Sequence, residues 1–159
     1  MLISFLKGLM DHKQPFNKRA SDNTSEEKFE EFCKDKNIIH FRYGTDQRNS
    51  GISGKDFIKI PKIIRNTPDY IVIKKTASFI EVKGCKDFAR MKLKDLESYD
   101  FWNKLMKLYY CIYSVTFNEM RFISHVALKN LVKGCNIKQF HDFTPYDKKE
   151  YYEIPFKEL

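Results

Sequence analysis

Three stretches of the chain repeat their hydrophobic residues at the spacing of an α-helix. The first follows Ser25, which can cap a helix, and it places Phe29, Phe32 and Cys33 on one face. Acidic residues fill its first turn, where negative charge stabilises a helix N-terminus. The third stretch ends in a glycine that can close a helix. The pattern predicts helices over residues 26–37, 95–107 and 125–134.

Runs of β-branched and aromatic residues predict the strands. These runs cover residues 38–44, 57–64, 69–74, 78–83, 108–117 and 121–124. Pro61 limits its run to an edge or bulged strand, and the short link 75–77 predicts a hairpin between its two flanking runs. The polar segment 45–56 and the basic segment 85–94 are expected to be loops. Because helices and strands interleave, we predict an α/β (α+β) fold with a mixed sheet flanked by helices.

The 159 residues, of which 42% are apolar, have the size and composition of one folded domain. The expected parts are an N-terminal segment and linker over 1–24, a core domain over 25–141 and a C-terminal tail over 142–159. The tail is acidic and should pack on the core through its apolar side chains, Tyr151, Tyr152, Ile154 and Phe156. The formal net charge of +8 favours a polyanionic partner.

The composition argues against a membrane protein and against disulfides. No stretch approaches the roughly 20 apolar residues of a membrane helix, so no membrane partner is expected. The apolar start of the chain lacks the basic region and cleavage site of a signal peptide. The four cysteines form no CxxC pair, which favours reduced thiols and a cytoplasmic location. The abundance of Lys, Asn, Ile, Phe and Tyr is typical of an AT-rich genome such as that of a phage, which would place the protein in the host cytoplasm.

The predicted hairpin gathers two carboxylates and a lysine. A tight turn at 75–77 brings Asp69 across from Glu81, and Glu81 and Lys83 share a face because strand side chains alternate. Two facing carboxylates repel each other unless a cation lies between them, and Mg²⁺ takes such hard oxygen ligands. A lysine beside a metal-bound water can orient or deprotonate that water, or neutralise a phosphate. The simpler alternative is a hairpin with a structural Lys–Asp pair.

Four features favour chemistry over the structural pair. Asp69 follows a proline at the start of a strand, and Glu81 and Lys83 end the next strand before a glycine. An acidic helix precedes them, and the chain is basic. A lone match to D…ExK is weak, whereas the combination favours a catalytic hairpin.

The residues Pro68-Asp69 and Glu81-Val82-Lys83 resemble the motif of the PD-(D/E)xK nuclease superfamily. The resemblance covers most of the predicted core domain and implies a restriction-endonuclease-like core with its active site on the central hairpin. It implies that Asp69 and Glu81 bind Mg²⁺ or Mn²⁺ and act in catalysis. The Val82 carbonyl would be a further metal ligand, and Lys83 would be the catalytic lysine.

Many members of this superfamily add a glutamate from the first helix to the metal site. On a helix at 100° per residue, Glu26 lies nearest the centre of the predicted apolar face, and Glu30 lies next. Glu27 and Glu31 point away from that face. We expect Glu26 to be a catalytic and metal-binding residue, with Glu30 as the open alternative.

Basic residues flank the predicted site on both sides along the chain. A set that directly follows the hairpin could clamp phosphates beside the scissile one: Lys86, Arg90, Lys92 and Lys94. Lys62 and Arg65 provide a second set just before the hairpin. Phosphate contacts of this kind would make affinity for nucleic acid fall steeply with salt.

Together these observations predict a Mg²⁺-dependent endodeoxyribonuclease. The chain has no separate module for reading DNA sequence, which favours structure-selective or weakly sequence-selective cutting of the junction-resolving, recombination or repair type. Similar small members of the superfamily include Holliday junction resolvases and phage nucleases. Junction resolution needs two active sites, so that variant predicts a homodimer. The alternatives are a non-catalytic nucleic-acid-binding protein on a nuclease scaffold, and an RNase or single-strand-specific nuclease.

Overall fold

A five-stranded mixed sheet in the order β1-β2-β3-β5-β6 forms the centre of the protein. The computed structural model describes residues 20–44, 52–141 and 148–159. The other residues of the expected N-terminal segment, polar loop and tail lie outside this description. β3 and β5 run parallel, and the other neighbours are antiparallel. The strands are β1 (Ile39–Arg42), β2 (Tyr70–Ile73), β3 (Ala77–Cys85), β5 (Leu108–Ser114) and β6 (Glu119–Ser124).

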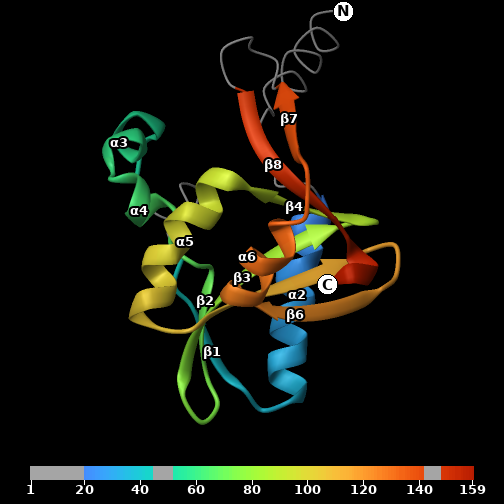
Figure 1. The fold of residues 1–159 in the computed structure, drawn as a ribbon. Helices are drawn as coiled ribbons and strands as arrows, with labels where there is room; N and C mark the ends of the chain where they lie inside the picture. Colours follow the sequence, from blue (N-terminus) through green and yellow to red (C-terminus); the bar gives the residue numbers. More distant parts are fainter. Residues whose placement is uncertain (1–19, 45–51, 142–147) are drawn as a thin grey trace, which may run out of the picture.

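Helices cover both faces of this sheet, as the sequence predicts (Figure 1). Helix α2 (Ala20–Asp35) packs Phe29 and Cys33 against apolar side chains of β2, β3 and β5. Helices α5 (Leu93–Leu105) and α6 (His125–Val132) pack on the opposite face. Burial of these two apolar layers is the main stabilising contribution in a fold of this size.

A second, three-stranded sheet extends the layer that contains α5. It has the order β4-β8-β7, with β4 (Phe88–Lys92), β7 (Ile137–His141) and β8 (Lys148–Pro155), and η1 (Phe156–Glu158) follows it. The prediction of a loop over 85–94 is therefore wrong. Ala89 and Met91 point into the core while Arg90 and Lys92 face outward, and the pairing partner β8 lies far along the chain. Ile154 and Phe156 are buried in the same core.

The predicted strand over 57–64 is also wrong. Residues Gly54–Lys59 form helix α3 and Lys62–Arg65 form helix α4. The side chain of Ser53 caps α3 by accepting a hydrogen bond from the backbone of Asp56, and Pro61 starts α4, a position that proline tolerates. Local capping therefore outweighs the β-propensity of the isoleucines.

The helices α5 and α6 lie where the pattern predicts them, whereas α2 begins before the predicted Glu26. Ser25 is buried within α2 and does not cap it. No helix within 20–44, 52–141 and 148–159 is long and apolar enough to cross a membrane.

Candidate active site

The β2–β3 hairpin places Asp69 directly across from Glu81. Tyr70 pairs with Ile80 in an antiparallel register, so the next pair outward is Asp69 and Glu81. The Val82 backbone N–H donates to Oδ2 of Asp69 at 2.8 Å, which fixes the orientation of this carboxylate. The facing pair predicted from the hairpin pattern is therefore present.

The backbone of Asp69 is held by the end of β1. Its carbonyl oxygen accepts hydrogen bonds from the N–H groups of Tyr43 at 2.8 Å and Gly44 at 3.0 Å. A Cβ atom on Gly44 would lie 3.0 Å from the Cα of Asp69, so the close approach of these two segments requires glycine. Asp69 thus lies on a rigid sheet position and not on a loose loop.

Glu81 and Lys83 form a close ion pair on the same face of β3. Lys83 Nζ lies 2.9 Å from Oε1 of Glu81, and the two side chains are 24% and 9% exposed, respectively. Burial alone would lower the pKa of Lys83, but the charges of Glu81, Asp95 and Asp69 outweigh burial and raise it. Lys83 is therefore a cation at neutral pH, suited to neutralise an anionic substrate.

The pKa of Asp69 is held well above its ordinary value. Burial is the largest cause and the charge of Glu81 is the next, while the Val82 N–H and the charge of Lys83 oppose them. Two facing carboxylates of which one has its pKa raised in this way favour a bound cation.

The second carboxylate oxygen of Glu81 also favours a bound cation. Oε2 is buried and has no hydrogen-bond partner among the described residues. A buried acceptor without a partner is costly, and a cation would satisfy it. Mg²⁺ often binds through only one or two carboxylates together with water and phosphate, so Asp69 and Glu81 fit such an ion. Within the described part of the chain, no three or more His, Cys, Asp or Glu side chains are arranged to hold a metal.

Glu26 approaches the pair from α2 but is engaged elsewhere. Its Oε2 lies 2.9 Å from Nη1 of Arg42 in β1, and its charge contributes to the raised pKa of Asp69. The alternative, Glu30, accepts a hydrogen bond from the Tyr70 hydroxyl at 2.8 Å. Of the two glutamates, the structure therefore places Glu26 within electrostatic reach of Asp69.

The sequence analysis missed three residues around the site: Arg42, Asp95 and Tyr99. Asp95 and Tyr99 are one turn apart on α5, so they share the helix side that faces β3. Burial, together with the charges of Glu81 and Asp69, raises the pKa of the Tyr99 hydroxyl. Two features of the sequence could have indicated these residues. Asp95 and Tyr99 are spaced i, i+4 beside an apolar helix face, and Arg42 lies within the otherwise apolar run of β1.

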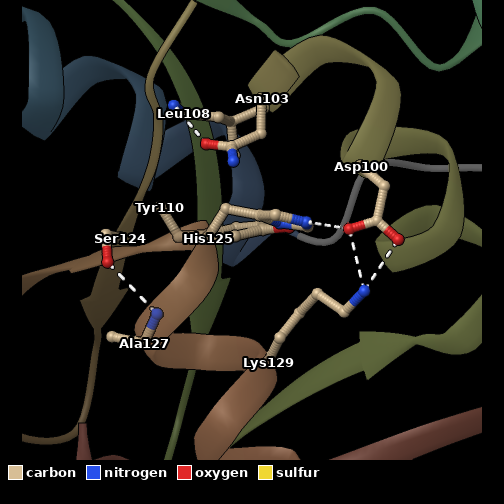
Figure 2. A network of polar contacts seen from close by, with 8 residues as sticks. All are labelled: Asp100, Asn103, Leu108, Tyr110, Ser124, His125, Ala127 and Lys129. Atoms are coloured by element: carbon tan, nitrogen blue, oxygen red, sulfur yellow. Dashed lines mark hydrogen bonds and ion pairs between the residues drawn. The ribbon is translucent and has the colours of Figure 1, made fainter.

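A polar network that runs from the core to the surface lies behind Glu81. Tyr110, the neighbour of Glu81 on β5, has its hydroxyl 3.0 Å from Nδ1 of His125, and Nε2 of His125 lies 2.8 Å from Asp100 (Figure 2). Lys129 Nζ donates to both oxygens of Asp100. The network ties α5 and α6 to the strand that supports the site.

Comparison with solved structures identifies the fold. The chain is similar to Hjc, a Holliday junction resolvase from the archaeal hyperthermophile Archaeoglobus fulgidus, with a TM-score of 0.51 and 11% identity. The match covers 87% of this chain and 86% of the resolvase. The chain shares its fold with this resolvase.

The chain is also similar to a second structure, D212, a nuclease from a fusselovirus. The TM-score is 0.48 at 16% identity, over 86% of this chain and 81% of that one. No model of a known protein family and no curated protein sequence matches this chain. The likeness to the resolvase establishes the fold, and the chemistry rests on this chain's own residues.

The predicted phosphate-binding residues lie in two places on this fold. Lys86 in the turn before β4, Lys92 at the end of β4 and Lys94 at the start of α5 are all exposed. Arg90 is partnered: its Nε lies 3.1 Å from Glu153, and its guanidinium lies 5.4 Å from the centre of the Tyr151 ring.

Lys62 and Arg65 lie on α4, which is attached to the first half of α5. Asn66 follows α4 and donates to Ser98 at 3.1 Å and to Asp95 at 3.5 Å. Since Asp95 acts electrostatically on Lys83, this attachment lies beside the β2–β3 hairpin.

Proposed function

We propose that this chain is a Mg²⁺-dependent endodeoxyribonuclease, with Mn²⁺ as the alternative metal. The observation that carries the proposal is the facing pair Asp69 and Glu81, with a buried, unpartnered Glu81 oxygen and a protonated Lys83 beside it. The alternative, a structural ion pair with Lys83 alone, accounts for Oε1 of Glu81 but leaves Oε2 without a partner. The nuclease fold agrees with this chemistry.

In this proposal Asp69 and Glu81 hold the metal, and the carbonyl of Val82 is a further ligand. The bound ion would act as a Lewis acid on the phosphate and lower the pKa of a water that attacks it. Lys83 neutralises negative charge that develops on the phosphate in the transition state. The Val82 N–H keeps one oxygen of Asp69 fixed, so the carboxylate keeps its orientation when the substrate binds.

Glu26 is the third proposed carboxylate. Glu26 forms an ion pair with Arg42 that keeps its carboxylate near Asp69. Among the described residues, it does not form a group of three metal ligands with Asp69 and Glu81. We propose that it binds the metal only when the ion and the substrate compete with Arg42 for its carboxylate. Arg42 is then released toward the negative charge of the DNA.

The proposed substrate is DNA with a branch or other structural feature, as in junction resolution, recombination or repair. The described residues form one nuclease fold with an appended small sheet, and no separate module for reading sequence is seen among them. Cutting both strands of a junction symmetrically needs two active sites, so the proposal includes a homodimer. The basic residues Lys86, Lys92 and Lys94 would hold the duplex beside the cleaved bond.

The test is a cleavage assay on a duplex, a single strand, a flap and a four-way junction, with Mg²⁺, Mn²⁺ or EDTA. Asp69→Asn, Glu81→Gln and Lys83→Gln are compared with Glu119→Gln, which changes an exposed, ion-paired glutamate on β6. We expect metal-dependent cutting that is lost in the first three variants by a factor of about 100 or more and kept in the control. DNA binding in EDTA without cleavage of any substrate would instead indicate a binding protein on a nuclease scaffold, and preferential cutting of RNA or single strands would reassign the substrate.

A further inference from the structure

Helices α3 and α4 form a small arm that stands away from the body of the protein. We call residues 54–65 the α3–α4 arm; it projects beside α5 (Figure 1). Neither of its helices has a buried residue. Ile58 is 70% exposed, and Ile64 is also exposed. The arm therefore presents an exposed apolar residue on a projecting surface and buries none of its own residues.

The charge of the arm indicates the chemistry of its partner. It carries four basic residues, Lys55, Lys59, Lys62 and Arg65, against the single acid Asp56. Asp56 is bound internally by Ser53 and by Lys59, whose Nζ lies 2.9 Å away. Lysine is depleted at protein–protein interfaces and typical of phosphate contacts, so a nucleic acid is favoured over a protein.

The arm is attached next to the proposed active site. The indole N–H of Trp102 donates to the carbonyl of Ile63 at 3.2 Å, and Asn66 bonds to Ser98 on the same helix. Only Asn66, Thr67 and Pro68 separate the arm from Asp69. A nucleic acid held by the arm would therefore be continuous with the strand held at Asp69 and Lys83.

We infer that the α3–α4 arm recognises the branch point of DNA: its lysines and arginine hold the phosphates of one duplex arm, and Ile58 inserts as an apolar wedge at the unstacked base pair. This inference rests on the proposed nuclease function and deepens it by naming the feature of the substrate that is read. Apolar side chains are inserted between base steps by many DNA-bending proteins, and cationic residues accompany them. Unstacking costs least at a branch, where base pairs are already weakened, so the wedge would select branched over linear DNA.

The test uses the full chain in EDTA, so that no cleavage occurs, with a four-way junction that carries 2-aminopurine at the branch point. Unstacking of this base increases its fluorescence. We expect wild-type protein to increase the fluorescence of the junction, and Ile58→Ser to reduce that increase several-fold. The matched control is Val126→Ser, which changes a 59% exposed aliphatic residue on α6 and should behave as the wild type.

A second measurement tests the phosphate contacts of the arm. Replacing Lys55 and Lys62 together by Ala should reduce the slope of log affinity against log salt by about 2. Circular dichroism melts establish that each variant is folded. Unchanged slope and unchanged fluorescence in the arm variants would overturn the inference, and loss of self-association in those variants would reassign the arm to a protein contact.

These outcomes separate the inference from the proposed function. A chain that unstacks the junction through Ile58 in EDTA but cleaves no DNA with Mg²⁺ would retain the wedge and overturn the nuclease. A chain that cleaves DNA while Ile58→Ser matches the wild type in fluorescence and in the ratio of junction to duplex cleavage would retain the nuclease and overturn the wedge.

Discussion

Arg42 and Glu26 bridge the two elements that flank Asp69, with Nη1 of the arginine 2.9 Å from Oε2 of the glutamate. Burial on its own would lower the pKa of Arg42, but Glu26, Tyr70 and Asp69 together raise it. The guanidinium therefore balances the acidic side of the site where the proposed metal would bind. The Arg42 guanidinium interacts electrostatically with Asp69 as well as with Glu26.

This relationship predicts that Arg42 competes with the metal. In Arg42→Gln the competing cation is gone, so Mn²⁺ should bind about threefold to fivefold more tightly in the absence of DNA. Isothermal titration calorimetry measures the change. Lys28→Gln is the control, because Lys28 forms an exposed ion pair with Glu31 on the same helix as Glu26. Weaker Mn²⁺ binding in Arg42→Gln would contradict the competition.

The raised pKa of Asp69 predicts that this carboxylate destabilises the metal-free fold. A carboxyl group whose pKa is higher in the folded state loses its stabilising contribution as the pH rises from its ordinary value of 3.8 through the raised value. Asp69→Asn removes this loss and keeps an acceptor for the Val82 N–H. In EDTA its melting temperature should exceed that of the wild type by about 2–6 °C near neutral pH.

The pH dependence distinguishes this explanation from a general effect of the substitution. The gain from Asp69→Asn should shrink toward zero as the pH falls to about 4, where the wild-type carboxyl is also protonated. Asp35→Asn, at the exposed end of α2, should show no such trend. A gain that is independent of pH, or a loss at neutral pH, would be inconsistent with the raised pKa.

The Glu81–Lys83 pair predicts a non-additive pair of substitutions. Lys83→Gln leaves a buried carboxylate without its cation and should lower the free energy of unfolding by about 1–3 kcal/mol. The pKa of Lys83 is raised above its ordinary value of 10.5. The ion pair therefore contributes its full stability at neutral pH and up to pH 10.5, and this stability is lost only as the pH rises through the raised pKa. Urea unfolding at neutral pH in EDTA measures the effect.

The double variant Glu81→Gln with Lys83→Gln is the control for this pair. It removes both charges, so it should regain most of the stability that Lys83→Gln loses. Equal stabilities for Lys83→Gln and the double variant would show that the two side chains do not interact energetically.

The network behind Glu81 predicts a stability effect that disappears in acid. Burial alone would raise the pKa of Asp100, but hydrogen bonds from Lys129 and His125 outweigh it and lower the pKa below 3.8. The Asp100 carboxylate therefore stabilises the fold above pH 3.8, and this stabilisation is lost as the pH falls through the lowered pKa of Asp100. Asp100→Asn should melt several degrees lower than the wild type near neutral pH, and the difference should vanish below the lowered pKa. A difference that persists in acid would mean that packing and not charge is responsible.

The sequence by itself determined the β2–β3 hairpin and its charged residues. The facing of Asp69 and Glu81, and the shared face of Glu81 and Lys83, follow from strand alternation and one short turn, which are rules that act over a few residues. The helices α5 and α6 follow from apolar spacing in the same way.

Only the tertiary structure decided the surroundings of that hairpin. Three interactions join segments that are far apart along the chain. They are the pairing of β4 with β8, the ion pair of Arg42 with Glu26 and the ion pair of Arg90 with Glu153. No local pattern specifies such partners, because many arrangements satisfy the same propensities and only long-range packing selects among them. The raised pKa of Asp69 has the same origin, since burial and neighbouring charge exist only once the chain has folded.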